Sequence, residues 1–185
     1  MQVIAEVKTD SPFGWHASKS WEELFEIANQ IGDIISIHTD RRWNGSFELL
    51  KKARTLTNKP ILAKGIHTSD ADITKALTHG ADFVLVVGRL PAIHTDVCLI
   101  ETNTIDELKA IPTHLKAVWN SRDLNNGELK PDLFVQARKH FSGWLCQASN
   151  IAHLDDVDER ADAILVGTHL PSFAREKMSH GFVVY

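Results

Sequence analysis

The sequence lacks the features by which membrane proteins and nucleic-acid-binding proteins are recognised. Its 185 residues hold no apolar run near the ~18 residues of a membrane-spanning helix, and no basic-then-apolar leader precedes the first strand-like run. Charges of both signs are interspersed and sum to -4, so no basic surface is expected to bind nucleic acid or a membrane. We therefore expect a cytoplasmic protein whose partner is a small molecule.

Cysteine is scarce, and histidine, although frequent, lacks the spacing of metal ligands. The two cysteines, Cys98 and Cys146, lie in strand-like runs, where a packed free thiol is the ordinary state. The ten histidines form no HxH, HxxxH or HExxH pair. The sequence thus predicts neither a disulfide nor a metal site.

Eight short runs rich in Val, Ile and Leu are typical of buried strands. They cover residues 2–8, 33–38, 59–64, 82–87, 96–101, 115–120, 143–148 and 161–167. Helix start signals of the capping-box kind stand between several of them, at Ser20 and Glu23, Ser69 and Asp72, and Thr104 and Glu107. Gly80 stands where the third helix should end.

This alternation predicts one domain over residues 1–185, a closed (β/α)8 barrel of the TIM type. An open doubly wound sheet is the alternative. It would need a glycine-rich phosphate loop after the first strand, and Ser11-Pro-Phe-Gly-Trp15 is not one.

One unit of the predicted barrel is too short. Only residues 88–96 separate the fourth run from the fifth, so we expect the fourth helix to be missing. Four side chains would then point outward without a helix over them: Val84, Val86, Cys98 and Ile100. We hypothesise that part of this groove is covered by Leu90, Pro91 and Ile93. The rest would pack against a second copy about a two-fold axis, giving a homodimer.

Polar side chains gather at the carboxyl ends of several runs. Glu6 and Lys8 stand two residues apart on one face of the first, which burial alone does not explain. Lys64 ends the third run, Glu101 the fifth and Asn120 the sixth. Because barrel enzymes carry their active sites at this end, we expect an active site there. The alternative is a set of ion pairs that only stabilise the barrel rim.

Together with their neighbours, these strand ends resemble the indole-3-glycerol-phosphate synthase family, (β/α)8 enzymes of tryptophan biosynthesis. Ile4-Ala-Glu-Val-Lys-Thr-Asp-Ser-Pro12 is similar to the family's opening Ile-Ala-Glu-x-Lys-x-x-Ser-Pro, and Asn120-Ser-Arg-Asp-Leu124 is the most specific match. The other matching segments follow in the family's order: residues 39–47, 62–64, 80–85, 99–101 and 163–168.

The resemblance implies that an anthranilate joined to a deoxyribulose phosphate is closed to an indole, with loss of CO2 and water and without a cofactor. It implies that Lys64 is the general acid and Glu101 the general base. Lys8 would reach the phosphate or the ring-closing centre, Glu6 would hold the two ammonium groups, and Asn120 would bond the sugar oxygens.

The resemblance also implies two groups of binding residues. Those that contact the rest of the substrate would be Ser11, Trp43, Leu85, Arg122 and Leu124. Those that bind the phosphate, besides Lys8, would be Ser149, Asn150, Gly167 and Thr168.

The sequence departs from the family pattern at several places. The family's Glu-Ser-Gly-Ile after strand seven reads Ala148-Ser-Asn-Ile151, and in a straight register Gln147 points to the helices and cannot replace the lost carboxylate. Gly65-Ile66 follows Lys64 where the family has Asp-Phe, and Phe13 replaces a serine. The chain starts at strand one, so we expect the family's N-terminal extension, which covers the barrel mouth, to be absent.

We therefore expect a shortened, divergent member of the family. The second hypothesis is a non-catalytic or repurposed barrel that binds a phosphorylated small molecule. A third hypothesis is the sister isomerase that acts one step earlier in the pathway. That enzyme would need a cysteine at the barrel mouth after the first strand, where this sequence has Glu6 and Lys8.

Overall fold

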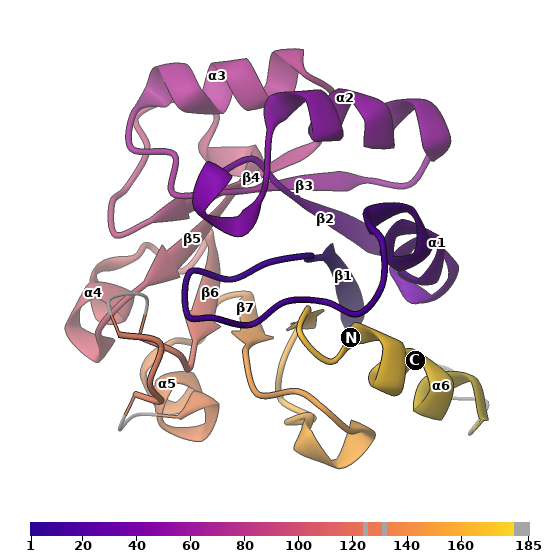
Figure 1. Cartoon of the computed structure of the whole chain (residues 1–185). Coiled ribbons are helices and arrows are strands. Elements are labelled where there is room, and N and C mark those ends of the chain that lie inside the picture. The colour runs from indigo at the N-terminus through magenta and orange to yellow at the C-terminus, as the bar shows by residue number, and fades with distance from the viewer. Residues whose placement is uncertain (124–125, 131–132, 180–185) are drawn as a thin grey trace.

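The structure is a computed structural model that describes residues 1–123, 126–130 and 133–179. Eight parallel strands close into a barrel in sequence order, with β8 paired to β1 (Figure 1). The strands are β1 (Gln2–Val7), β2 (Ile34–His38), β3 (Ile61–Lys64), β4 (Phe83–Val87), β5 (Cys98–Thr102), β6 (Lys116–Asn120), β7 (Leu145–Ala148) and β8 (Ala163–Val166). The predicted (β/α)8 barrel is confirmed, and each strand lies within one or two residues of its expected run.

Six α-helices surround the barrel in the described part of the chain. They are α1 (Trp21–Ile31), α2 (Phe47–Leu56), α3 (Asp70–Thr78), α4 (Ile105–Ala110), α5 (Phe134–His140) and α6 (Leu170–Ser179). Capping boxes close at Ser20 and Ser69 as predicted. Thr104 makes only half of its box: it accepts the N–H of Glu107, whose carboxylate instead accepts the N–H of Asn103. No helix in the described residues is long and apolar enough to cross a membrane.

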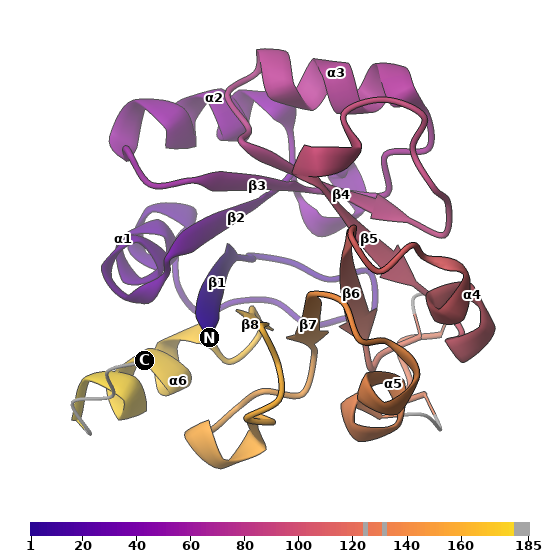
Figure 2. The same ribbon diagram turned by 180° about the vertical axis from the view of Figure 1, so that it is seen from behind.

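Among the residues that the structure describes, no α-helix lies between β4 and β5, as predicted, and none lies between β7 and β8, which the sequence did not indicate. Only the 3-10 turn Thr95–Val97 precedes β5, and only the 3-10 turn Leu154–Asp156 lies between β7 and β8 (Figure 2). The second connection is fixed by Gln147, whose amide donates to the carbonyl of Asp156 and accepts the N–H of Asp158. Gln147 therefore faces outward, and its tertiary hydrogen bonds replace those of a helix.

The outward side chains of β4 and β5 are already buried within one copy of the chain. Val84, Val86 and Cys98 are fully buried and Ile100 is 1% exposed, in one apolar cluster with side chains of α3 and α4: Ile73, Ala76 and Leu108. The neighbouring helices thus cover the groove.

The expectation that residues 90–93 cover that groove is wrong for two of its three side chains. Pro91 is buried, but Leu90 and Ile93 are 50% and 41% exposed. The connection is held to the start of α3 instead, because Asp70 bonds the Arg89 guanidinium at 2.6 Å and the Ala92 N–H at 3.1 Å. The homodimer stays a hypothesis, without the exposed groove that motivated it.

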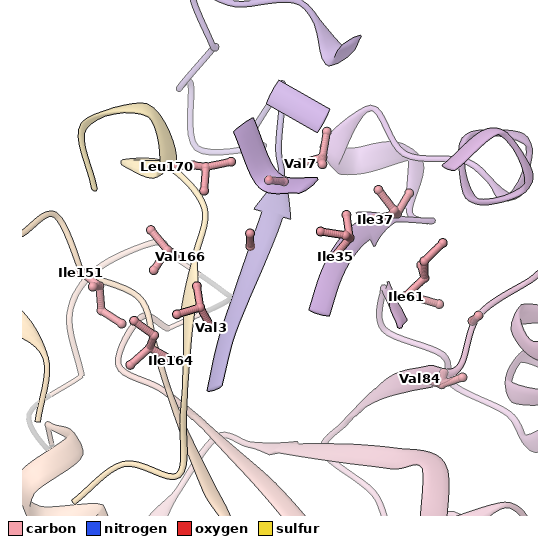
Figure 3. Packing of buried hydrophobic residues seen from close by; sticks show 14 of the residues in the cluster. Val3, Val7, Ile35, Ile37, Ile61, Val84, Ile151, Ile164, Val166 and Leu170 are labelled. Carbon is pink, nitrogen blue, oxygen red and sulfur yellow. The ribbon is translucent and has the colours of Figure 1, made fainter. Parts of the chain in front are cut away.

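Alternation along the strands produces two apolar layers and leaves the barrel mouth polar. One layer packs between strands and helices, with side chains such as Val3, Ile35 and Val166 (Figure 3). The other fills the barrel interior and includes Ile4, Leu62, Leu85, Leu99, Val118, Cys146, Ala148 and Leu165. The next inward-facing positions toward the carboxyl ends of the strands are polar, so the same alternation that fills the interior ends in polar side chains at the mouth. These side chains are Glu6, His38, Lys64, Glu101 and Asn120.

Candidate active site

A pocket opens at the carboxyl ends of the strands, with about 850 Å³ of empty space including its open mouth. The predicted site residues that line it are Glu6, Lys8, Ser11, Trp43, Lys64, Leu85, Glu101, Asn120, Arg122, Ser149, Asn150, Gly167 and Thr168. Leu124 lies outside the described residues. The polar strand ends thus converge on one cavity.

Glu6 is the anion at the centre of the pocket. Its Oε1 accepts hydrogen bonds from Lys64 Nζ at 2.8 Å and from His38 Nε2 at 2.5 Å. Burial alone would raise the pKa of the Glu6 carboxyl, but Lys64, His38 and Lys8 hold it well below 4.5. Burial would likewise lower the pKa of Lys64, but Glu6 and Glu101 raise it above 10.5. The site therefore holds an ionised carboxylate beside a protonated lysine.

Gly167 is needed for this arrangement because Glu6 packs directly against it. A Cβ at position 167 would lie 1.8 Å from Glu6 Oε2 and 2.7 Å from Glu6 Cδ. No side chain fits there unless the carboxylate moves.

Glu101 forms a second group with Asn120 and Ser149. The Asn120 amide donates to Glu101 Oε1 at 3.0 Å, and its oxygen accepts the Ser149 hydroxyl at 2.5 Å and the Arg122 N–H at 3.0 Å. Burial raises the pKa of Glu101 above 4.5, against the opposing influence of Lys64 and Asn120. The two carboxyl groups of the pocket are thus driven apart in pKa, a pattern typical of a site that separates acid and base roles.

Cationic side chains lie beside the loops that follow β7 and β8. Lys8 Nζ donates to Thr168 Oγ1 at 3.2 Å and lies 5.2 Å from the centre of the Trp15 ring system. Burial lowers the pKa of Lys8, and Lys64 and Arg122 lower it further against the influence of Glu6. The Arg122 guanidinium donates to Asn150 Oδ1 at 3.3 Å. These groups suit an anionic ligand.

The backbone at this end is shaped for the same purpose. Ser149 and Asn150 both have left-handed φ values, of 69° and 56°, where the sequence indicated only Asn150. α6 begins at Leu170, but the Leu170 N–H already donates to the Gly167 carbonyl at 2.9 Å and Pro171 has no N–H. The successive N–H groups of the turn at Ser149 and Asn150 remain as candidates to face an anion.

His38 is the main site residue that sequence reasoning missed. It ends an apolar run, Ile34-Ile-Ser-Ile-His38, whose composition predicts only a buried strand. The sequence signal for its place at the pocket is that His38 is the last residue of its run, as Lys64 is of the third, and the structure pairs the two in register. Its ring stacks on Trp43 with centres 5.8 Å apart and an angle of 8°.

Ala148 leaves β7 without a carboxylate at the pocket. Its side chain belongs to the apolar interior of the barrel, and Gln147 faces away as expected. In the part of the chain that the structure describes, no three His, Cys, Asp or Glu side chains are grouped as metal ligands.

Fold and site together define a (β/α)8 barrel with a lysine–carboxylate pair and further cationic side chains in a pocket at the carboxyl ends of its strands. The chain belongs to the indole-3-glycerol phosphate synthase family, whose model matches residues 1–179.

Relatives in the same family confirm the resemblance seen in the sequence. The indole-3-glycerol phosphate synthase of Pyrococcus furiosus is 31% identical over 204 aligned positions, which cover 91% of this chain and 85% of the relative. That of Prochlorococcus marinus is 33% identical over 144 positions, 69% of this chain and 48% of the relative. A crystal structure of 3-hexulose-6-phosphate synthase matches with a TM-score of 0.64 at 14% identity, over 97% of this chain and 99% of that chain. This last match shows a common fold.

Proposed function

We propose that this chain converts 1-(2-carboxyphenylamino)-1-deoxyribulose 5-phosphate to indole-3-glycerol phosphate, with loss of CO2 and water, as a step of tryptophan biosynthesis. The observation that carries the proposal is the Glu6–Lys64 pair facing the same pocket as the Glu101–Asn120 pair. Family membership supports the same reaction.

The reaction needs a proton donor at the sugar carbonyl, and Lys64 is the protonated group of the pocket. The ring carbon that bears the carboxylate attacks the carbonyl carbon, while the carbonyl oxygen takes a proton from Lys64. CO2 then leaves, and the electrons of the broken bond restore the aromatic ring. Glu6 keeps Lys64 charged before the transfer, since its carboxylate is the nearest anion.

The second half of the reaction needs a base. Lys64 regains a proton from solvent and gives it to the hydroxyl, which leaves as water. A proton then leaves the carbon beside the nitrogen, which completes the indole. Glu101 takes that proton, because burial gives its carboxyl the higher proton affinity of the two in the pocket. Asn120 holds Glu101 and Ser149 in place for this step.

Binding of the phosphate is assigned to the cationic end of the pocket. Lys8 supplies the charge, and the backbone at Ser149, Asn150, Gly167 and Thr168 supplies N–H groups. The anthranilate ring would lie against the apolar side chains of the mouth, which include Trp43 and Leu85, with Arg122 bonding its carboxylate.

A second candidate function is a barrel that binds a phosphorylated small molecule without converting it. The observation that favours it is Ala148, which leaves β7 without a carboxylate at the pocket. Such a protein would be non-catalytic or repurposed, and would bind a phosphorylated ligand without closing the indole.

Indole fluorescence with the anthranilate deoxyribulose phosphate substrate tests the proposal. We expect wild-type turnover, and a fall of ~10²-fold or more in Lys64→Ala, because the general acid is lost. Lys51→Ala is the matched control, since Lys51 is exposed on α2 and pairs only with Glu48 in the described residues. Wild-type turnover in Lys64→Ala would contradict the role of Lys64. Tight substrate binding by the wild type without product would establish the second candidate.

A further inference from the structure

His38 is bound to the central carboxylate of the pocket, yet the mechanism above gives it no role. It is 5% exposed, and its Nε2 lies 2.5 Å from the same Glu6 oxygen that accepts from Lys64. One carboxylate oxygen thus accepts hydrogen bonds from two side chains, one on β2 and one on β3.

The ring of His38 is held from behind by the loop that follows β2. A Cβ at Gly45 would lie 2.5 Å from the carbonyl carbon and oxygen of His38, so only glycine allows this approach. The Ser46 N–H donates to the same carbonyl at 3.0 Å, and Trp43 stacks on the imidazole. Gly45 and Ser46 thus fix the backbone of His38, and Trp43 contacts its ring on a side other than Glu6.

The surroundings of the ring select its neutral form, with the proton on Nε2. The charged groups that face it are Glu6 of β1, Lys8 directly after β1, Lys64 of β3 and Asp40 in the loop beyond β2. Burial lowers the pKa of His38, more than Glu6 raises it. Nδ1 is buried and, within the described residues, has no hydrogen-bond partner, so a second proton there would have no acceptor.

We propose that His38 is a positioning residue that holds the Glu6 carboxylate fixed while Lys64 gives up and regains its proton. When Lys64 becomes a neutral amine, Glu6 loses its nearest counter-charge inside a buried site. The Nε2–H of His38 keeps Glu6 Oε1 hydrogen-bonded at that moment. The Glu6 carboxylate therefore keeps the position in which it can bond Lys64 again when the amine is reprotonated.

The test compares two variants of His38 with a control. In His38→Gln the amide nitrogen can reach the place of Nε2, whereas in His38→Leu no donor remains. His114→Leu is the control for the loss of an imidazole, because His114 is exposed, precedes the N-terminal end of β6 and does not line the pocket. His38→Asn, which is too short to reach Glu6, replaces His38→Leu if circular dichroism shows that the leucine variant does not fold.

The first measurement needs no catalysis, so it separates this inference from the proposed function on which its kinetic part rests. Carbon-13 NMR of the Glu6 carboxyl, assigned with Glu6→Gln, should show its titration at higher pH in His38→Leu than in the wild type. His38→Gln and His114→Leu should titrate as the wild type does. An unchanged Glu6 titration in His38→Leu would overturn the proposal.

The second measurement is the split between kcat and KM. We expect kcat to fall about 10- to 100-fold in His38→Leu, with KM within about twofold of wild type and kcat largely restored in His38→Gln. A raised KM at unchanged kcat would show that His38 binds substrate instead, and would overturn the positioning role. Lack of turnover in the wild type would contradict the proposed function, while the NMR result would still decide the inference.

Discussion

Gly167→Ala is the substitution whose effect the structure constrains most closely. The new Cβ would lie 1.8 Å from Glu6 Oε2. Ordinary contact between heavy atoms needs ~3.5–4 Å, so the carboxylate must move by more than ~1 Å. Because a misplacement of ~1 Å can cost ~10²-fold in rate, we expect kcat/KM to fall by ~10²-fold or more. Overpacking of this kind also costs ~1–3 kcal/mol of unfolding free energy.

A double-mutant cycle isolates the clash with Glu6. Glu6→Ala keeps only the Cβ of that side chain, which lies 3.4 Å from the added Cβ, an ordinary contact. In that background Gly167→Ala should change the urea unfolding free energy by less than ~0.5 kcal/mol, against ~1–3 kcal/mol alone. Equal costs in the two backgrounds, or wild-type kcat/KM in the single variant, would show that the clash with Glu6 is not the cause.

Three further predictions concern the anion, the base and the thiols. Millimolar inorganic phosphate should compete with substrate, and Lys8→Ala should weaken that competition in steady-state kinetics; an unchanged inhibition constant would place the phosphate elsewhere. Glu101→Gln should abolish ~99% of turnover yet raise the unfolding free energy at pH 7 by ~0.5–2 kcal/mol. The unfolding free energy rises because burial raises the pKa of Glu101, so that the wild-type folded protein loses stability as pH rises above 4.5. The stability gained by Glu101→Gln should therefore vanish below that pH. A gain that is the same at every pH would contradict this cause. Burial raises the pKa of Cys98 to about 11, so Cys98 should resist a thiol reagent at pH 8 until the protein unfolds, whether sedimentation shows a monomer or a dimer.

The part of the fold that could be predicted is the part that local sequence determines. Alternation along each strand decides which side chains face the barrel interior, and so the positions of Glu6, Lys64, Glu101 and Asn120 followed from sequence alone. Capping boxes depend on residues three apart, and two of the three formed fully.

The features that could not be predicted depend on contacts between distant segments. Whether His38 meets Glu6 depends on the pairing of β1 with β2 and on the approach of Gly45. The missing seventh helix depends on the hydrogen bonds of Gln147 to a loop nine to eleven residues away. The cover over the outward side chains of β4 and β5 comes from α3 and α4, which belong to neighbouring units of the barrel. None of these leaves a pattern in a single stretch of sequence.

The most direct test of the proposed reaction uses substrate labelled with carbon-13 in the anthranilate carboxylate. If the chain closes the indole, wild-type protein should release one labelled CO2 for each indole-3-glycerol phosphate formed, and Lys64→Ala should release almost none. Substrate that binds in the pocket but keeps its label, or CO2 released without indole, would contradict the account.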